Sequence, residues 1–448
     1  MSEPIDVVLF STPTMSATFS PEAHMRGMLA FEAALADAEA RAGIIPQEAA
    51  RVIAASCREE LFDITALYHE AATAGTPAIP LVRMLTAHVA GDAQKFVHWG
   101  ATSQDAIDTA LMLQMREGLD LLVDGLFGLC SACVIHAEQH RSTLMVGRTL
   151  LQQALPITFG LKAARWLALA TRQVHALREC QQQHLTVQLG GAAGTLASLG
   201  DNGIRVVELL AEALHLSVPD LPWHTERDRV AQIAATLCVV AGAMEKIAGD
   251  VALLAQTEVG EVTEGAESGK GGSSAMPQKH NPVDATSAIA SARLAIGMVP
   301  VILSAMAQEH ERAVGGWQAE WAALPNLFRY TASAVERVKD AVVGLQIDPT
   351  RMKENLAMTR GLIMAESLTM VLATRIGRPE AYRIVQEACK RVIGSDKDLR
   401  QAVLEDAQVS KLLSPEEIDH ALDPSKYLGS TDVFIDRALA AYHEIESV

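Results

Sequence analysis

The sequence has few aromatic residues and too few basic residues to balance its acidic ones. Only 4% of its 448 residues are aromatic. Because strands concentrate aromatic and β-branched residues, this scarcity argues against an all-β fold. The 37 Lys and Arg residues against 54 Asp and Glu residues leave a formal charge of −17. That charge excludes most nucleic-acid and anionic-membrane partners, which need basic surface.

Cysteine is also scarce, with six residues in the whole chain. This is too sparse for a disulfide framework. Cys130 and Cys133 form a C-x-x-C pair, but the stretch around them is typical of a helix, and no second Cys/His pair completes four zinc ligands. We therefore expect buried, reduced thiols and no metal site. Dinucleotide-binding and P-loop fingerprints are missing too, so no cofactor is expected.

Targeting and membrane-spanning patterns are missing from the sequence. The N-terminal segment is acidic and its apolar run extends only from Val7 to Phe10, unlike a signal peptide. The longest uncharged windows, such as Leu294 to Gln308, fall short of the ~18 residues that a membrane span requires. We expect a cytoplasmic protein with no membrane partner.

Apolar residues, at 49%, are sufficient for a sizeable core, and their periodicity is helical. Val230, Leu237, Met244 and Val251 recur every seven residues, which predicts one long helix over about 230–258 that packs against other helices. Similar patterns predict long helices over 105–140, 156–184, 283–310 and 318–345. Five such helices predict a bundle, and a bundle with several apolar faces favours an oligomer.

Prolines and shorter patterns refine this prediction. Pro156 suits the first turn of its helix, whereas Pro300 and Pro325 should kink or interrupt theirs. The segments before and after the long helices have shorter periodic stretches, and Ser414-Pro-Glu-Glu417 is a capping box. The sequence thus predicts an all-α protein with three helical domains, over 1–100, 101–352 and 353–448.

One glycine-rich loop interrupts the helical pattern. Residues 264–282 read EGAESGKGGSSAMPQKHNP. Its glycines permit backbone N–H groups to converge on an anion, while Lys270 and Lys279 supply charge and Ser273 and Ser274 supply hydroxyls. This combination predicts a site for an anionic substrate. A solvated connector is the alternative interpretation of the same composition.

Three segments resemble one enzyme family. GSSAMPQKHNP, at 272–282, resembles the G-S-x-x-M-P-x-K-x-N-P signature of the fumarase/aspartase superfamily. HWGATSQD at 98–105 and GRTLLQQALP at 147–156, followed by QLGGAAGT from Gln188, resemble its other active-site regions. The resemblance implies three helical domains, with a central five-helix bundle that assembles into a 20-helix homotetramer core and active sites shared between subunits. It also implies reversible elimination beside a carboxylate.

The resemblance further implies roles for individual residues. Ser273 matches the residue that transfers the proton, with Ser274 as the competing candidate, and Lys279 and Asn281 match positions that bind the substrate carboxylate. The remaining positions implied to contact substrate are His98, Thr102, Ser103, Gln104, Thr149, Gln152, Met276 and His280. Helix capping and loop hydrogen bonding are the alternative for the Thr, Ser and Gln residues. Arg312 is expected to meet an additional carboxylate or, alternatively, to form a surface ion pair.

Two departures from the lyase pattern narrow the expected reaction. Leu150 stands where the lyases usually have a histidine that protonates the leaving group, and Thr286 stands where they have the glutamate that orients it. Amine and hydroxide leaving groups need such an acid. A carboxylate, with a pKa of about 4, departs as the anion without one.

The resemblance is therefore strongest to the 3-carboxy-cis,cis-muconate cycloisomerase family, with GGWQAEW at 315–321 and STDVFIDRAL also similar. It implies that a small tricarboxylate substrate closes into a γ-lactone, with Ser273 delivering a proton. An adenylosuccinate-lyase-like enzyme with a relocated acid is the first alternative, although Trp317 and Trp321 offer no charge to a nucleotide phosphate. A non-catalytic relative is the second.

Overall fold

A computed structural model describes residues 5–265 and 271–446 of the chain. The chain divides into two compact units, each assembled from three separate segments. The first contains residues 1–126, 173–245 and 287–337, and the second contains residues 127–172, 246–286 and 338–448. Lys270, expected to supply charge in the glycine-rich loop, lies outside the described residues.

Five long helices form where heptad-like patterns predict them. They are α7 (Ser103–Gln139), α8 (Phe159–His184), α10 (Asp228–Ala255), α11 (Val283–Ser304) and α12 (Gly316–Val343). The four heptad residues of α10, from Val230 to Val251, are all completely buried. Periodic apolar residues therefore determine where these helices form and which face they bury, and the largely helical fold is confirmed.

Neither of the two internal prolines interrupts its helix. Pro300 lies inside α11 and Pro325 inside α12. The α11 helix nevertheless ends at Ser304, six residues before the predicted end at His310. Each proline removes one backbone hydrogen bond, and a helix tolerates that loss when its other turns remain bonded and packed.

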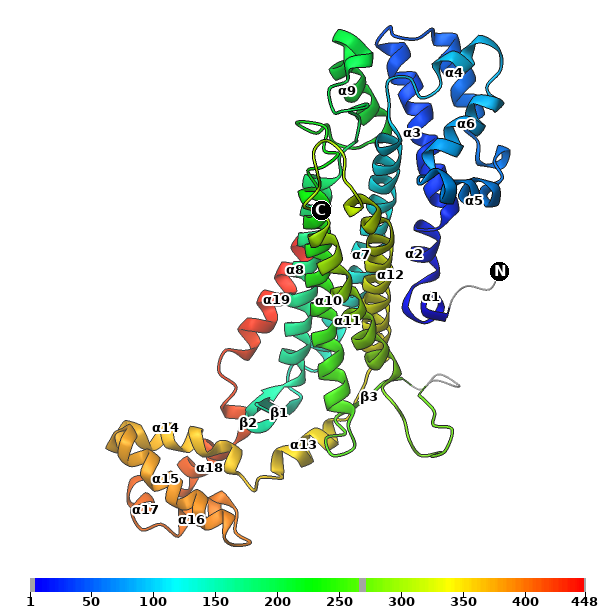
Figure 1. The fold of residues 1–448 in the computed structure, drawn as a ribbon. Coiled ribbons are helices and arrows are strands. Elements are labelled where there is room, and N and C mark those ends of the chain that lie inside the picture. Colours follow the sequence, from blue (N-terminus) through cyan, green and yellow to red (C-terminus); the bar gives the residue numbers. More distant parts are fainter. Residues whose placement is uncertain (1–4, 266–270, 447–448) are drawn as a thin grey trace. The chain divides into compact units, whose positions relative to one another are not determined.

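The first unit begins with short helices gathered around a longer one. These are α1 (Ile5–Phe10), α2 (Pro13–Thr18), α3 (Pro21–Arg41), α4 (Gln47–Ser56), η1 (Glu59–Leu61), α5 (Ile64–Ala74), α6 (Ala78–His88) and η2 (Gly91–Phe96). Ser20 caps the start of α3, because its side chain accepts a hydrogen bond from the Ala23 N–H. The helix packs against α4 and against α9 (Gly203–Leu214), which follows η3 (Ala197–Asn202) (Figure 1).

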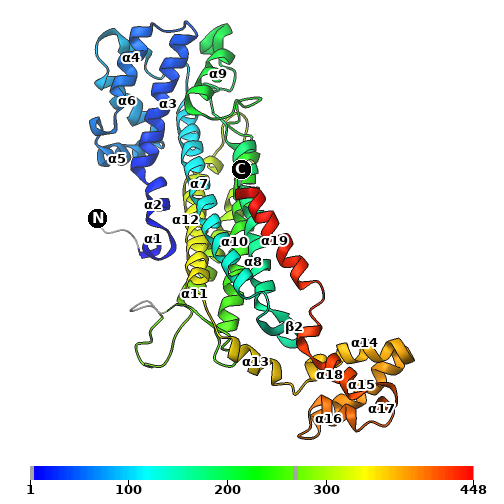
Figure 2. The same ribbon diagram turned by 180° about the vertical axis from the view of Figure 1, so that it is seen from behind.

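Close packing also joins α7 and α12 within the first unit. The two helices lie side by side in both ribbon views (Figures 1 and 2). A Cβ atom placed on Gly118 of α7 would lie 2.8 Å from a ring carbon of Phe328, and one on Gly125 would lie 2.9 Å from Val335. Glycine at these positions allows the helices to approach closely.

The second unit contains a β-hairpin where the sequence predicted the start of a helix. Strands β1 (Leu144–Thr149) and β2 (Gln152–Thr158) pair antiparallel, with Val146 opposite Pro156 and a bulge between Gly147 and Arg148. The prediction that Pro156 opens a helix is therefore wrong, and α8 begins three residues later. A two-stranded hairpin tolerates proline because each strand has an outward edge that needs no N–H donor.

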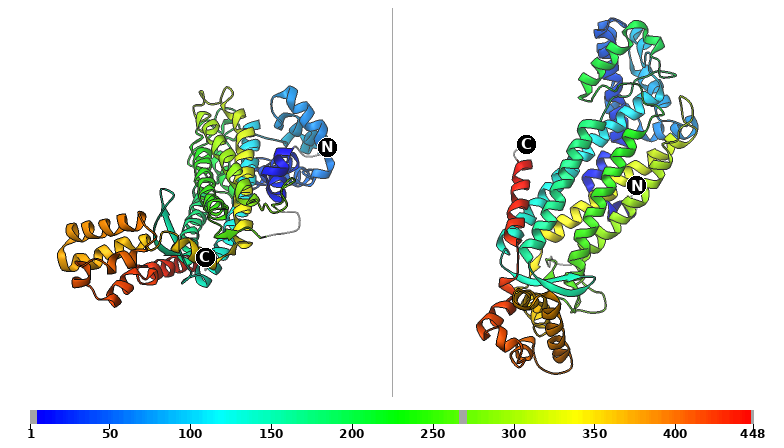
Figure 3. Two further views of the ribbon diagram at one scale, coloured as in Figure 1. Left: turned by 90° about the horizontal axis from the view of Figure 1, so that it is seen from below. Right: turned by 90° about the vertical axis from the view of Figure 1, so that its left-hand side faces the viewer.

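The rest of the second unit is a short strand pair and a group of small helices. Strands β3 (Val262–Thr263) and β4 (Gln346–Ile347) pair antiparallel, and α13 (Pro349–Ala357) follows. The helices drawn together in Figure 3 are α14 (Ala365–Ile376), α15 (Arg378–Ile393), α16 (Leu399–Leu404), α17 (Val409–Leu412) and α18 (Pro415–Leu422), with η4 (Leu362–Met364), η5 (Pro424–Lys426) and the C-terminal α19 (Thr431–Glu446) beside them in sequence.

Local capping and burial signals in the sequence are confirmed. Ser414 and Glu417 form both hydrogen bonds of the predicted capping box at α18. Cys130 and Cys133 are free thiols with no exposed surface. Burial raises the pKa of the Cys130 thiol to about 12, so it stays protonated.

Two helices qualify as candidate membrane spans by length and composition alone. They are α7 and α11, and a third candidate is the bent pair formed by α13 with residues 362–376. Neither α7 nor α11 contains a fully uncharged window of span length, but each qualifies with at most two charged residues in its window, so composition does not exclude a span. Within the chain, 44% of the α7 window and 33% of the α11 window are buried.

Candidate active site

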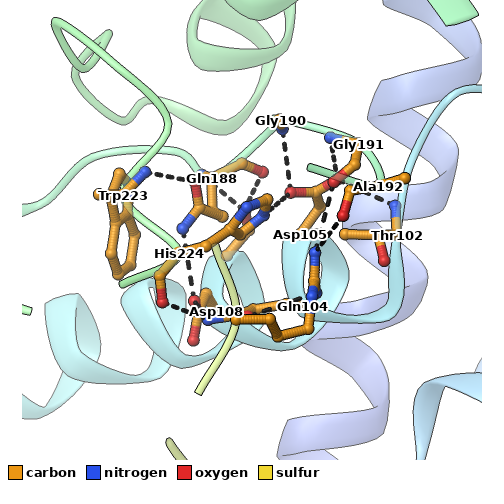
Figure 4. Close-up of polar contacts among 12 residues, drawn as sticks. Thr102, Gln104, Asp105, Asp108, Gln188, Gly190, Gly191, Ala192, Trp223 and His224 are labelled. Carbon is orange, nitrogen blue, oxygen red and sulfur yellow. Dashed lines mark hydrogen bonds and ion pairs between the residues drawn. The ribbon is translucent and has the colours of Figure 1, made fainter. Parts of the chain in front are cut away.

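A buried carboxylate anchors the start of α7 in the first unit (Figure 4). Asp105 has no exposed surface and accepts hydrogen bonds from the backbone N–H of Thr102 at 2.9 Å and of Gly190 and Gly191 at 3.0 Å each. Its Oδ1 also lies 2.7 Å from Nε2 of His224. A negative charge in the first turn is stabilised by the helix dipole. Asp105 therefore fixes the Gly190–Gly191 turn against the motif that begins at His98.

Gln104 and Arg312, both predicted to contact substrate, contact each other. The Gln104 Nε2 donates to the His224 carbonyl at 2.8 Å and to Asp108 Oδ2 at 3.1 Å, and its Oε1 accepts from Arg312 Nη1 at 3.3 Å. Arg312 Nη2 also donates to the Ala192 carbonyl at 3.0 Å. Gln104 is fully buried. Its described hydrogen bonds hold its side chain in a position where it supports Arg312.

A second set of buried charges, unpredicted from the sequence, supports this region. Arg227 donates to Asp108 at 2.7 Å and to Glu320 at 2.5 Å, and Trp317 Nε1 donates to Asp108 at 2.9 Å. Burial alone would lower the pKa of Arg227, but the two carboxylates raise it above its ordinary value. The sequence signal that could have predicted these buried charges is the presence of Asp105 and Asp108, three residues apart, among the apolar residues of α7.

His98, Thr102 and Ser103 approach the same helix start. His98 has a left-handed backbone with φ 56, and its Nδ1 lies 2.6 Å from Glu32 Oε1 on α3. Thr102 and Ser103 are half-buried. The Thr102 backbone N–H donates to the Asp105 carboxylate in the first turn of α7.

In the second unit, Thr149 and Gln152 form the last pair of the β-hairpin. Leu150 and Leu151 make the turn between them, with φ 50 and 63, and they are 97% and 74% exposed. The preceding Arg148 forms two hydrogen bonds, at 2.7 and 2.9 Å, to the buried carboxylate of Glu261. This bidentate ion pair anchors the hairpin below its exposed tip.

The signature loop, which is the part of the glycine-rich loop over residues 271–282, holds Ser273 differently from Ser274. Ser273 Oγ accepts from the backbone N–H of Met276 at 3.1 Å and of Ala275 at 3.4 Å. Both donors bind oxygen lone pairs, so the hydroxyl hydrogen of Ser273 remains available for donation. Ser274 is exposed, and its hydroxyl has no hydrogen bond within the described parts of the chain.

Asn281 joins the two ends of the signature loop by hydrogen bonds to Gly271. Its backbone N–H and its Nδ2 both donate to the Gly271 carbonyl, at 2.9 and 3.3 Å. Gly271 has φ 75, and a Cβ atom there would lie 2.9 Å from the Asn281 carbonyl oxygen. Met276, Lys279 and His280 are exposed along the same loop.

The residues at the two departures from the lyase pattern show no sign of an acid pair. Leu150 occupies the exposed tip of the hairpin. The Thr286 hydroxyl donates to the Pro282 carbonyl one turn earlier, at 2.7 Å. Neither side chain has an ionisable group that could protonate a leaving group.

Comparison with known proteins gives full-length matches. A family model described as lyase matches residues 9–297, and one described as adenylosuccinate lyase C-terminus matches residues 361–438. The chain belongs to the fumarase/aspartase superfamily of lyases. Within this superfamily, the 3-carboxy-cis,cis-muconate cycloisomerase of Pseudomonas aeruginosa is 46% identical over 439 residues, covering 97% of this chain and 96% of that protein.

Two further members of the superfamily are similar along their whole length. The 3-carboxy-cis,cis-muconate cycloisomerase of Bradyrhizobium diazoefficiens is also 46% identical, covering 97% of each chain. The crystal structure of the 3-carboxy-cis,cis-muconate lactonizing enzyme from Pseudomonas putida superimposes with a TM-score of 0.92, at 42% identity and 99% coverage of each chain. These matches confirm the family resemblance inferred from the three motifs.

Proposed function

We propose that this protein is a cycloisomerase that converts 3-carboxy-cis,cis-muconate to 4-carboxymuconolactone, a step in aromatic catabolism through β-ketoadipate. The observation that carries the proposal is the 46% identity, over nearly the full length, to enzymes named for this activity. The absence of the lyase acid pair at Leu150 and Thr286 agrees with it, because a carboxylate needs no proton to act as nucleophile or leaving group.

The reaction is an intramolecular addition that conserves all atoms. One substrate carboxylate oxygen forms a C–O bond to an alkene carbon, and the π electrons move to the carbon next to another carboxylate. A proton then forms the new C–H bond there. The negative charge that develops on that carboxylate needs nearby cations and hydrogen-bond donors, a role we assign to Lys279 and Asn281.

Ser273 is the residue we assign to proton delivery. Its oxygen already accepts from the Met276 and Ala275 N–H groups, which would stabilise the alkoxide left after the proton departs. Ser274 lacks that support in the described loop. The substrate contacts expected of Thr149, Gln152, Met276 and His280, which are all exposed, remain part of the proposal.

Arg312 is the proposed partner of an additional substrate carboxylate. Its guanidinium contacts Gln104 and backbone carbonyl oxygens, and no carboxylate of the described residues pairs with it. The surface ion pair considered as an alternative therefore has no candidate partner in residues 5–265 and 271–446. The Arg312 charge is positioned but not neutralised, which suits a tricarboxylate substrate. His98, Thr102 and Ser103 complete this part of the proposed site.

We further propose a cytoplasmic homotetramer with three helical domains, over 1–100, 101–352 and 353–448, and a core of 20 helices. The exposed apolar side chains of α10 and α11 support assembly, since large apolar surfaces are usually covered in the working protein. The most exposed of them are Val239, Leu253, Val301 and Leu303. The active sites would then be shared between subunits, and sizing by light scattering would give about four chains per particle.

The experiment that tests the function uses the purified full-length protein. Incubation with 3-carboxy-cis,cis-muconate should remove the diene absorbance and produce a lactone detectable by NMR. A parallel reaction with adenylosuccinate tests the alternative lyase activity. Turnover of adenylosuccinate without loss of the diene would contradict the proposal, and inactivity on both substrates would favour a non-catalytic relative.

A further inference from the structure

Two glutamates are buried on α3, and only Glu32 contacts a residue of the site described so far. Glu32 and Glu39 are 1% and 0% exposed, and they lie seven residues apart, so they occupy one face of the helix. Neither oxygen of Glu39 has a hydrogen-bond partner in the described parts of the chain, and Glu32 uses only Oε1. Buried carboxyl groups without partners are costly, so their position calls for a functional explanation.

The partner of Glu32 is His98, one of the predicted substrate contacts. The Glu32 Oε1 to His98 Nδ1 distance is 2.6 Å, which is shorter than the usual range of a neutral N–H···O hydrogen bond and agrees with a charge-assisted one. The His98 side chain is 16% exposed, and its Nε2 has no hydrogen bond within the described residues. The imidazole is therefore held at one nitrogen and available at the other.

The backbone around His98 is fixed as well. His98 has φ 56, a left-handed conformation that only a few per cent of non-glycine residues adopt. Gly100, two residues later, has φ 73, and a Cβ atom there would lie 2.5 Å from a methyl carbon of Leu199. Strained backbone held by surrounding packing is a common feature of functional sites. The direction of the imidazole is thus set by both its backbone and Glu32.

The charges around this pair are arranged to favour a protonated imidazole. Burial alone would lower the pKa of His98, but the charge and hydrogen bond of Glu32, together with the charge of Asp105, raise it above its ordinary value. Burial, reinforced by repulsion from Glu32, raises the pKa of Glu39 to about 9. The same two causes raise the pKa of the Cys57 thiol to about 12. The charges of Glu32 and Asp105 therefore act on His98, and only Glu32 is hydrogen-bonded to it, while Glu39 and Cys57 stay neutral.

We infer that Glu32 is a positioning residue that holds His98 as an imidazolium, so that Nε2 binds a carboxylate of the substrate. The inference rests on the proposed function for the identity of that substrate. Glu39, although equally buried, does not share this role, because neither of its oxygens is hydrogen-bonded to His98. This pair of glutamates on one helix provides a test residue and a matched control.

The first test measures His98 without any substrate. Exchange of the histidine C2 hydrogen, followed by mass spectrometry of the full chain across pH, reports the protonation midpoint of each histidine. In Glu32→Gln the His98 midpoint should fall by about one pH unit or more. In Glu39→Gln, which replaces a neutral acid by a neutral amide, it should stay at the wild-type value. An unchanged midpoint in Glu32→Gln, or an equal fall in both variants, would overturn the inference.

A conservative variant covers the case in which Glu32→Gln fails to fold. Glu32→Asp retains the charge but shortens the side chain, so the His98 midpoint should remain above the ordinary value. Circular dichroism and thermal unfolding would establish that each variant is folded. A Glu32→Asp midpoint that lies below the ordinary value in folded protein would show that the carboxylate charge does not act on His98, and would overturn the inference.

The second test measures how the Glu32–His98 pair affects the pH dependence of catalysis. Neutral His98 cannot bind a carboxylate as a cation, so kcat/KM for lactone formation should fall as pH rises through the His98 midpoint. In Glu32→Gln this fall should move to lower pH, with a larger change in KM than in kcat. A uniform loss of kcat/KM without a shift would indicate a purely structural role and would contradict the inference. Absence of lactone formation in the wild-type protein would instead refute the proposed function, while the exchange test would still decide the Glu32–His98 pairing.

Discussion

The start of α7 and the signature loop both carry predicted site residues, but they are held in opposite ways. Asp105 is fully buried and receives hydrogen bonds from three backbone N–H groups and His224. By contrast, seven consecutive residues of the loop, from Ser274 to His280, are exposed. If the proposed function is right, buried charges hold the start of α7 in place and the exposed loop provides the reacting groups.

The largest expected effect separates the two serines of the loop. Ser273→Ala should reduce kcat for lactone formation by about 10²- to 10⁴-fold, the usual contribution of a positioned proton donor. Ser274→Ala, its neighbour without backbone donors, should retain a rate close to wild type. Steady-state kinetics on both variants checks the prediction. Equal losses in the two variants would remove the distinction between the serines.

The buried ion pairs of Arg227 with Asp108 and Glu320 should contribute to the stability of the folded protein. Arg227→Met leaves Asp108 and Glu320 as buried carboxylates without their shared cation, which should lower the free energy of unfolding by about 3 to 5 kcal/mol. Arg205→Met removes an exposed ion pair with Glu208 and should change it by about 1 kcal/mol or less. Urea unfolding of both variants makes the comparison. Similar values would mean that the buried network is not a framework.

Glu39 should make stability depend on pH. The folded protein keeps a proton on Glu39 up to about pH 9, whereas the unfolded chain releases it above about pH 4.5. Its contribution to stability is therefore complete below pH 4.5 and is lost as pH rises toward 9. Glu39→Gln should remove this loss, so the variant should gain stability relative to wild type by up to about 1.4 kcal/mol per pH unit across that range.

Urea unfolding at several pH values measures this difference, and the exposed Glu48 offers a control. Glu48→Gln changes a residue whose side chain is 78% exposed, so the pH dependence should match that of the wild type. A Glu39→Gln variant whose stability runs parallel to wild type across pH would show that Glu39 is ionised when folded.

The smallest effect is expected when the acid pair of the lyases is introduced at positions 150 and 286. Leu150→His combined with Thr286→Glu restores the residue pair of the lyases, but it should not increase the rate of lactone formation, because the attacking carboxylate needs no proton. Leu150 is 97% exposed, so the change is not expected to disturb packing. A large rate gain, measured under saturating substrate, would show that the reaction does need this acid.

Local patterns in the sequence predicted the parts of the fold that local interactions determine. Heptad spacing predicted α10, and the capping box at Ser414 predicted the start of α18. The β-hairpin was missed because Pro156 also suits a helix start, and only its pairing with Val146 distinguishes the two. Periodicity and capping rules describe single segments, so a proline that serves two structures is decided by tertiary contacts.

The candidate site shows the same limit. Motif resemblance predicted His98 and Ser273 as site residues, but it gave no prediction for Glu32 or Arg227, which act through contacts distant in sequence. Glu32 pairs with a residue 66 positions away, and Arg227 with partners 119 and 93 positions away. Such pairings leave no spacing pattern in one sequence. Their only local signal is a charged residue within an apolar helical stretch.

The most direct test of the central claim is the reaction of the wild-type protein with 3-carboxy-cis,cis-muconate in D₂O, followed by NMR. Addition of a substrate carboxylate with proton delivery from an exchangeable hydroxyl predicts a single lactone that carries one deuterium, on the carbon next to a carboxylate. The mass of the product should otherwise equal that of the substrate. Release of a separate carboxylic acid fragment, or a lactone without deuterium, would contradict the account.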